Sequence, residues 1–209
     1  MTFVLLIRHA ENDFSGKKRL AGRLADVHLN DSGKEQAQRL AKTLAGLPLK
    51  AIYSSPLERA IETAQPIAEQ NDLKVIPHDG LIEIDYGDWQ GQSLKSLYRT
   101  KLWKTVQHAP AWLQFPNGET LLEAQYRISR TLREIAAQYE PKDWIACVSH
   151  ADPIKLAIAH FLSIPLEAYQ RLTIGLASIT VVHLDAQGAR LLTVNHDPLL
   201  MSFLTKQVG

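Results

Sequence analysis

Four side chains suited to handling a phosphate stand at or just after the ends of apolar runs: Arg8, His9, Arg59 and His150. The apolar runs cover residues 3–7, 51–56 and 144–149. In a chain that alternates strands and helices, such run ends lie along one edge of a parallel sheet, where open α/β folds bind ligands. Residues separated by over 140 positions are therefore expected to share one pocket. Two imidazoles and two guanidiniums there would form an electropositive site that contains a nucleophile.

The candidate nucleophile is His9. An imidazole has an ordinary pKa of about 6.5 and is substantially unprotonated near neutral pH. One ring nitrogen can attack phosphorus while the other donates a hydrogen bond that fixes the ring, and such covalent catalysis divides one difficult displacement into two easier steps. A structural histidine at a strand end is the commoner role of a single histidine, and the local sequence leaves both interpretations open.

The other three side chains could hold the transferred phosphoryl group. Phosphoryl transfer needs positioning and neutralisation of charged oxygens, and the guanidinium fork binds phosphate in a bidentate manner without losing its proton. Arg8 and Arg59 fit this role, although Arg59 lies in the first turns of a predicted helix, where most arginines are solvated. His150 would hold an oxygen and stabilise the transition state. Asp152, which precedes Pro153, is interpreted mainly as the N-cap of a helix.

Hydrolysis of a phosphate ester also needs an acid for the leaving alkoxide and a base for water. Glu83 has apolar neighbours on both sides, and partial desolvation would raise its pKa above about 4.3 and favour this role. Asp85 and Asp88 are alternatives.

The hydrophobic pattern predicts the elements that must position these groups. Strands are expected near residues 2–7, 51–54, 73–76, 144–149, 178–184 and 191–195, the last two as a hairpin. Helices are expected from Ser32 to about residue 45, from Ser55 to about residue 70, and over about 121–139 and 153–162, with Ser32 and Ser55 as N-caps of capping boxes. We predict an α/β fold with a mostly parallel central sheet, helices on both faces in three layers, C-terminal hairpin-like strands, and a small irregular cap segment around residues 79–117. The simplest domain count is one, over residues 1–209.

Composition limits the kind of protein. The chain is 45% apolar and 22% charged with a formal net charge of +1, which gives no sign of a nucleic-acid or membrane-surface partner. The single cysteine, Cys147, cannot form an internal disulfide and is expected in the core. Without a signal segment or a long apolar stretch, a soluble cytoplasmic protein is expected. Oligomeric state stays open.

An ordered set of short motifs resembles the histidine phosphatase superfamily, in the branch that also contains cofactor-dependent phosphoglycerate mutases. The matching segments cover residues 6–10, 29–33, 54–64, 83–91, 115–120 and 148–150. The resemblance implies that His9 is the phosphorylated nucleophile and that Glu83 is the proton donor. It also implies that Arg8, Arg59 and His150 hold the phosphoryl group without a metal or other cofactor.

The chain departs from that family at several positions. Ala10 stands where Gly is usual, Ser15 where many members have Asn, and Ala151-Asp152 where one or two Gly follow the second histidine. Ser15 and Ala151 are expected to be substrate-binding positions. Because Ser15 replaces the Asn of many members, the neutral contact which that Asn would make with the phosphate is not expected to be kept unchanged.

A phosphatase is favoured over a mutase because only 24 residues separate Gly91 from Pro116, and a short, open cap admits water as the acceptor. Phosphoglycerate mutase-type transfer and a non-catalytic phosphate-binding protein are the alternatives. The expected substrate is a small phosphorylated metabolite. Five aromatic residues of the middle segment are hypothesised to line the leaving-group side, with three cations for extra negative charge: Trp89, Tyr98, Trp103, Trp112 and Phe115, and Arg99, Lys101 and Lys104.

Overall fold

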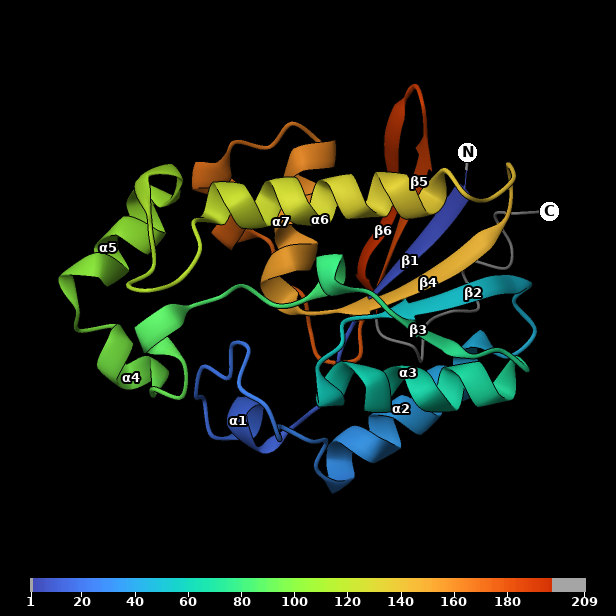
Figure 1. Ribbon diagram of the computed structural model, residues 1–209, viewed down its shortest axis with the longest axis horizontal. Helices are drawn as coiled ribbons and strands as arrows, with labels where there is room; N and C mark the ends of the chain where they lie inside the picture. Colours follow the sequence, from blue (N-terminus) through green and yellow to red (C-terminus); the bar gives the residue numbers. More distant parts are fainter. Residues whose placement is uncertain (1, 197–209) are drawn as a thin grey trace.

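The computed structural model describes residues 2–196, which contain a six-stranded sheet (Figure 1). Its order is β3-β2-β4-β1-β5-β6. The strands are β1 (Thr2–Arg8), β2 (Leu49–Ser54), β3 (Val75–Pro77), β4 (Trp144–Ser149), β5 (Ile179–Asp185) and β6 (Gly188–His196). β1, β2, β3 and β4 are parallel to one another, whereas β5 runs antiparallel to both of its neighbours, β1 and β6. The predicted mostly parallel sheet and C-terminal hairpin are confirmed.

Four helices cover the two faces of this sheet (Figure 1). On one face lie α2 (Asp31–Leu44) and α3 (Glu58–Gln70), and on the other lie α6 (Leu121–Ala136) and α7 (Ala151–Phe161). The apolar run of β1 serves both layers, because alternate side chains of a strand point to opposite faces. Leu5 and Ile7 pack toward α2 and α3, and Val4 and Leu6 pack toward α6 and α7. The three-layer prediction is confirmed.

Strand register brings the predicted site residues to one sheet edge. Arg8 at the end of β1 is aligned with Ser149 at the end of β4. Val148 in turn is aligned with Ser54 at the end of β2. The residues that follow these three strands therefore emerge side by side, although they are far apart in the sequence.

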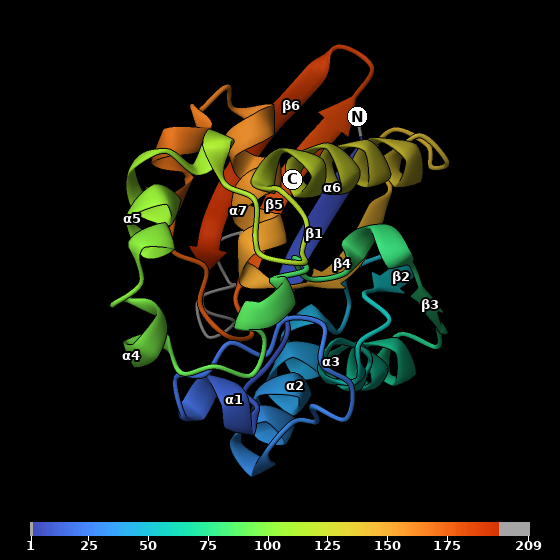
Figure 2. The same ribbon diagram turned by 60° about the vertical axis from the view of Figure 1, so that its left-hand side comes forward.

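The cap segment around residues 79–117 is more regular than predicted. It contains the 3-10 turns η1 (Asp79–Leu81), η2 (Gly87–Trp89) and η3 (Pro110–Trp112) and the helices α4 (Leu94–Leu97) and α5 (Lys101–His108). Ser93 and Thr100 cap these two helices with their side chains. The two helices are short, which is why the sequence analysis did not predict them. Residues of the loop after α1 (Asp13–Gly16) pair with the segment before α4, and Figure 2 shows both helices at the same end of the molecule.

Three predicted helix starts were wrong in detail. Asn30, not Ser32, caps α2, because its side chain accepts the N–H of Gly33. α3 begins at Glu58 after an extended Leu57 with no side-chain cap, whereas the Ser55 hydroxyl accepts the Leu57 N–H at 3.4 Å and also bonds His150 at 2.8 Å. α7 begins at Ala151 with His150 in the N-cap position, so Asp152 is a helical residue whose carboxylate is turned to other partners.

Other boundaries shifted slightly: β3 covers 75–77 rather than 73–76, α6 ends at residue 136, and a 3-10 segment, η4 (Leu166–Arg171), follows α7. Within residues 2–196, no helix combines the length and apolar character needed to cross a membrane. The last dozen residues, whose structure the sequence left ambiguous, lie outside the described range.

Candidate active site

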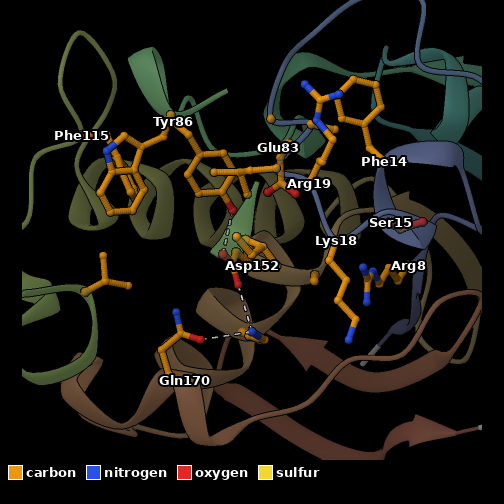
Figure 3. A pocket seen from close by; sticks show the side chains of 18 of the residues that line it. Arg8, Phe14, Ser15, Lys18, Arg19, Glu83, Tyr86, Phe115, Asp152 and Gln170 are labelled. Carbon is orange, nitrogen blue, oxygen red and sulfur yellow. Dashed lines mark hydrogen bonds and ion pairs between the residues drawn. The ribbon is translucent and has the colours of Figure 1, made fainter. Parts of the chain in front are cut away.

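A cavity of about 840 Å³ opens at the carboxyl edge of the parallel strands (Figure 3). Arg8, His9, Arg59 and Glu83 line it. His150 lies directly behind, fully buried. The fold thus brings together all five residues predicted to be catalytic, drawn from β1, α3, the segment after η1 and the end of β4.

The His9 ring is held in one orientation. Nδ1 lies 2.7 Å from the carbonyl oxygen of Ala10, an acceptor only, so Nδ1 carries the hydrogen and Nε2 has a free lone pair. Burial, and after it the charges of Arg59 and Arg8, lower the pKa of His9 well below its ordinary value. The ring is therefore neutral near pH 7, as a nucleophile must be. The Ala10 N–H in turn donates to Thr63 Oγ1 at 2.9 Å, which anchors the backbone that follows the nucleophile.

Both guanidiniums carry buried N–H groups without partners. Arg59 is 1% exposed, and its Nε and Nη1 lack hydrogen bonds among the described residues. The same is true of Arg8 Nε. Each arginine is tethered by one other nitrogen: Arg8 Nη1 to the Ile174 carbonyl and Arg59 Nη2 to the Gly22 carbonyl, both at 2.7 Å. Unpaired buried donors are costly, and fixed donors of this kind fit an anion that arrives with the substrate.

His150 is placed between Arg59 and Ser55. Its Nδ1 lies 3.3 Å from Arg59 Nη2 and its Nε2 lies 2.8 Å from Ser55 Oγ. Because a guanidinium only donates, Nδ1 accepts and Nε2 donates to the hydroxyl. Burial and the neighbouring Arg59 lower the pKa of His150 well below its usual range. The centroids of the His9 and His150 rings are 5.1 Å apart, so one phosphoryl group can contact both.

Two carboxylates border the cavity in different environments. Glu83 is 9% exposed, accepts the Ile84 N–H at 2.9 Å, and has an oxygen 4.0 Å from His150 Nδ1. Burial, and then the charge of Asp152, raise the pKa of Glu83 to about 7. A group with that pKa can both donate and accept a proton near neutral pH.

Asp152 is the ionised member of the pair. Its Oδ2 accepts from the Tyr86 hydroxyl at 2.7 Å and its Oδ1 from Lys155 Nζ at 3.0 Å. Burial opposes ionisation, but the Lys155 ammonium and the Tyr86 hydrogen bond outweigh it and lower the pKa of Asp152. The predicted N-cap role was wrong because both carboxylate oxygens face the cavity wall instead of the helix N-terminus.

The two weaker candidate positions both line the cavity. Ser15 is committed to α1: its hydroxyl donates to the Asn12 carbonyl and accepts the Asn12 N–H, at 2.8 and 3.0 Å. It can reach a phosphate only by giving up these bonds. Ala151 adds a small side chain at the start of α7.

The prediction for the leaving-group side was partly correct. Trp89, Tyr98, Trp103 and Phe115 line the cavity, whereas Trp112 is 87% exposed. The three predicted cations do not line it; the cavity instead has three others, namely Lys18, Arg19 and Lys155.

Sequence reasoning missed Ser55, Thr63, Tyr86 and Lys155. Only Lys155 had a local signal, its (i, i+3) spacing from Asp152 on a predicted helix. Ser55, Thr63 and Tyr86 make contacts over 53 to 95 positions, which no short motif reveals. Residues 2–196 contain no cluster of three or more His, Cys, Asp or Glu side chains that could hold a metal ion.

Known proteins similar to this chain include phosphatases and a phosphoglycerate mutase. Phosphoserine phosphatase 1 of Hydrogenobacter thermophilus is 32% identical over 198 residues, which cover 93% of this chain and 92% of that protein. The 2,3-bisphosphoglycerate-dependent phosphoglycerate mutase of Thermoplasma acidophilum is 31% identical over 198 residues, with 93% and 92% covered. The crystal structure of a phosphoserine phosphatase mutant from Entamoeba histolytica, in complex with phosphoserine, has a TM-score of 0.87 and 29% identity and covers 96% of this chain and 100% of that one.

A family model for the histidine phosphatase superfamily (branch 1) matches residues 4–197. That range contains every motif on which the sequence resemblance depended, all of the sheet except the first two residues of β1, and the residues that line the cavity. The chain belongs to the histidine phosphatase superfamily, branch 1.

Proposed function

We propose that this protein hydrolyses phosphomonoesters of small metabolites through a phosphohistidine on His9. The observation that carries the proposal is the set of buried, unpartnered guanidinium N–H groups beside an imidazole whose Nε2 is free. Such a pocket is complementary to a phosphoryl dianion. The relatives whose names specify phosphoserine and phosphoglycerate add support for a small substrate.

In the first step the His9 Nε2 lone pair attacks phosphorus and the bond from phosphorus to the ester oxygen breaks. Glu83, protonated at this stage, gives its proton to the leaving oxygen, so a neutral alcohol departs. Arg8 and Arg59 neutralise the phosphoryl oxygens throughout. His150 accepts from Arg59 Nη2 through its Nδ1 and so orients that guanidinium against the phosphoryl oxygens. The products are the alcohol, phosphohistidine and the Glu83 carboxylate.

In the second step water attacks the phosphohistidine. The Glu83 carboxylate takes a proton from the water as the new bond from oxygen to phosphorus forms. The phosphorus–Nε2 bond breaks, its electron pair returns to His9, and inorganic phosphate leaves. Both proton transfers use one carboxyl group, which requires a pKa close to the working pH.

Hydrolysis is proposed over mutase-type transfer because the cap is short. The 24 residues between Gly91 and Pro116 form two short helices and a 3-10 turn, and a mutase must exclude water while the intermediate is reoriented. Because one relative is a phosphoglycerate mutase, both reactions should be measured. Released inorganic phosphate indicates hydrolysis, and an isomerised product indicates mutase-type transfer.

The test of the proposal is the His9→Ala variant with 32P-labelled phosphoserine under rapid quench. The parent is expected to acquire acid-labile, base-stable phosphate and to release inorganic phosphate, and His9→Ala to do neither. His160→Ala is the matched control, since His160 is exposed at the far end of α7, and should behave as the parent. Turnover should also survive a strong chelator. If His9→Ala kept most of its turnover, the nucleophile assignment would be wrong.

A further inference from the structure

Lys155 is a cation on the cavity wall that the two reaction steps do not use. It lies on α7, lines the cavity, and its side chain is only 14% exposed. Nζ donates to Asp152 Oδ1 at 3.0 Å and to Gln170 Oε1 at 3.4 Å. These two partners, one on α7 and one on η4, fix the position of the ammonium.

This corner of the cavity presents hydrogen-bond donors. An ammonium has three N–H groups, and two of those on Lys155 are engaged by Asp152 and Gln170. The hydroxyl of Tyr169 accepts from Gln170 Nε2 at 2.6 Å, and its own hydrogen has no acceptor among residues 2–196. Both carboxylate oxygens of Asp152 already accept hydrogen bonds, Oδ2 from Tyr86 and Oδ1 from Lys155.

The corner lies on the side where the leaving group must go. In Figure 3, Gln170 and Phe115 stand on the opposite side of the view from Arg8 and Ser15, with Glu83 and Asp152 between them. An ester whose phosphoryl group lies against Arg8 and whose bridging oxygen faces Glu83 therefore directs its organic part toward Lys155.

We propose that Lys155 binds an anionic group, a carboxylate or a second phosphate, carried by the leaving group of the substrate. The proposal rests on the function proposed above and narrows it to anionic phosphomonoesters. Asp152 and Gln170 act as positioning residues that hold the ammonium. A charge-assisted hydrogen bond in a largely desolvated site should raise kcat/KM for such substrates by about 10- to 100-fold.

The experiment uses substrate pairs that differ in the anionic group. Phosphoserine is compared with phosphoethanolamine, and 3-phosphoglycerate with glycerol 3-phosphate, which report on a carboxylate. Fructose 1,6-bisphosphate compared with fructose 6-phosphate reports on a second phosphate. The parent should prefer the anionic member of at least one pair. Lys155→Gln should abolish that preference, mainly through KM. Because Lys155 also helps to keep Asp152 ionised, any effect on the acid–base group should change both members of a pair equally, and the ratio between the two members is the readout.

Two further variants make the result interpretable. Lys155→Arg keeps the charge and should retain the preference in part. Lys104→Gln removes an exposed cation of the cap that does not line the cavity and should leave both members of every pair unchanged. Should Lys155→Gln fail to fold in a thermal unfolding assay, Tyr169→Phe replaces it, with a smaller loss confined to the anionic members.

Equal losses on both members of each pair would overturn the proposal, because Lys155 would then have only a structural role. A parent without any preference would overturn it as well. Either result leaves the phosphatase assignment intact as long as turnover still depends on His9.

Discussion

Glu83 and Asp152 show how one chemical group acquires two roles from its surroundings. Asp152 has an ammonium and a hydroxyl bonded to its oxygens and is ionised. Glu83 is buried and accepts a single backbone N–H. Its burial and the nearby negative charge of Asp152 both disfavour ionisation of Glu83. Two interacting carboxyl groups with separated pKa values are a common acid–base arrangement in active sites.

The first prediction concerns pH. Glu83 must be protonated to release an alkoxide, so kcat/KM for an alkyl phosphate, which reports on the first step, should fall as the pH rises through about 7, the raised pKa of this group. On the acid side, kcat/KM should persist below the ordinary histidine pKa, because the pKa of His9 is lowered and its ring stays neutral there. Stopped assays across the pH range, with phosphoserine as substrate, measure both limbs.

Glu83→Gln provides the control for that assignment. It should reduce kcat for alkyl phosphates by about 10²–10³-fold and abolish the alkaline limb. The loss should be smaller for p-nitrophenyl phosphate, whose phenolate leaves without a proton. An alkaline limb that persists in Glu83→Gln would assign the titration to a different group.

At the scale of elements, the loop after β1 is positioned by close packing against α2. A Cβ added to Gly33 would lie 2.0 Å from the Glu11 carbonyl oxygen. The same carbonyl accepts the N–H of Asn30 at 3.2 Å. The loop after β1 and the start of α2 therefore lie so close together that only a glycine fits at position 33. This contact helps to fix the backbone that carries His9 and Ala10.

The second prediction is that Gly33→Ala forces this loop and α2 apart. Overpacking at such a contact should lower the free energy of unfolding by about 1–3 kcal/mol, and kcat should fall because the nucleophile moves. Urea unfolding and steady-state kinetics measure the two effects. Gly16→Ala is the matched control, since its new Cβ would approach only Glu11 Oε1, at 3.8 Å. Parent-like stability of Gly33→Ala would contradict the packing argument.

At the scale of the whole molecule, the fold maintains two guanidiniums with unpaired N–H groups beneath its sheet edge. Desolvated donors of this kind disfavour the empty folded state. Any anion that completes their hydrogen bonds binds the folded chain and not the unfolded one, and therefore raises stability. Arg59 is therefore expected to raise activity while lowering the stability of the protein without a bound anion.

The third prediction follows. Vanadate, an analogue of the phosphoryl group, should raise the stability of the parent, by about 2.7 kcal/mol at a concentration of 100 Kd. Arg59→Met should lose that increase and about 10²–10³-fold in activity, yet be at least as stable as the parent without vanadate. Thermal unfolding with and without vanadate measures this. Arg130→Met, at an exposed ion pair on α6, should respond to vanadate as the parent does; a marked destabilisation of Arg59→Met alone would refute the argument.

Much of the fold was predictable because its signals are local. Apolar runs followed by cations predicted β1, β2 and β4, and helical periodicity predicted α2, α3, α6 and α7. The capping residues were less predictable: Ser55 has the features of an N-cap, but its hydroxyl bonds His150, 95 positions away. Helices α4 and α5 were missed because they are short and packed within a cap whose contacts are tertiary.

By itself, the sequence determined the alternation of strands and helices and the family, and it predicted that Arg8, His9, Arg59 and His150 converge on one site, because each depends on residue type and spacing along the chain. The choice of Glu83 over Asp85 and Asp88 came from the resemblance to the family. Only the tertiary structure decided which nitrogen of His9 is free, which carboxyl group is neutral, and which lysines line the cavity. Those properties depend on desolvation and on hydrogen bonds between distant segments, and the same local sequence in another setting would have different ones.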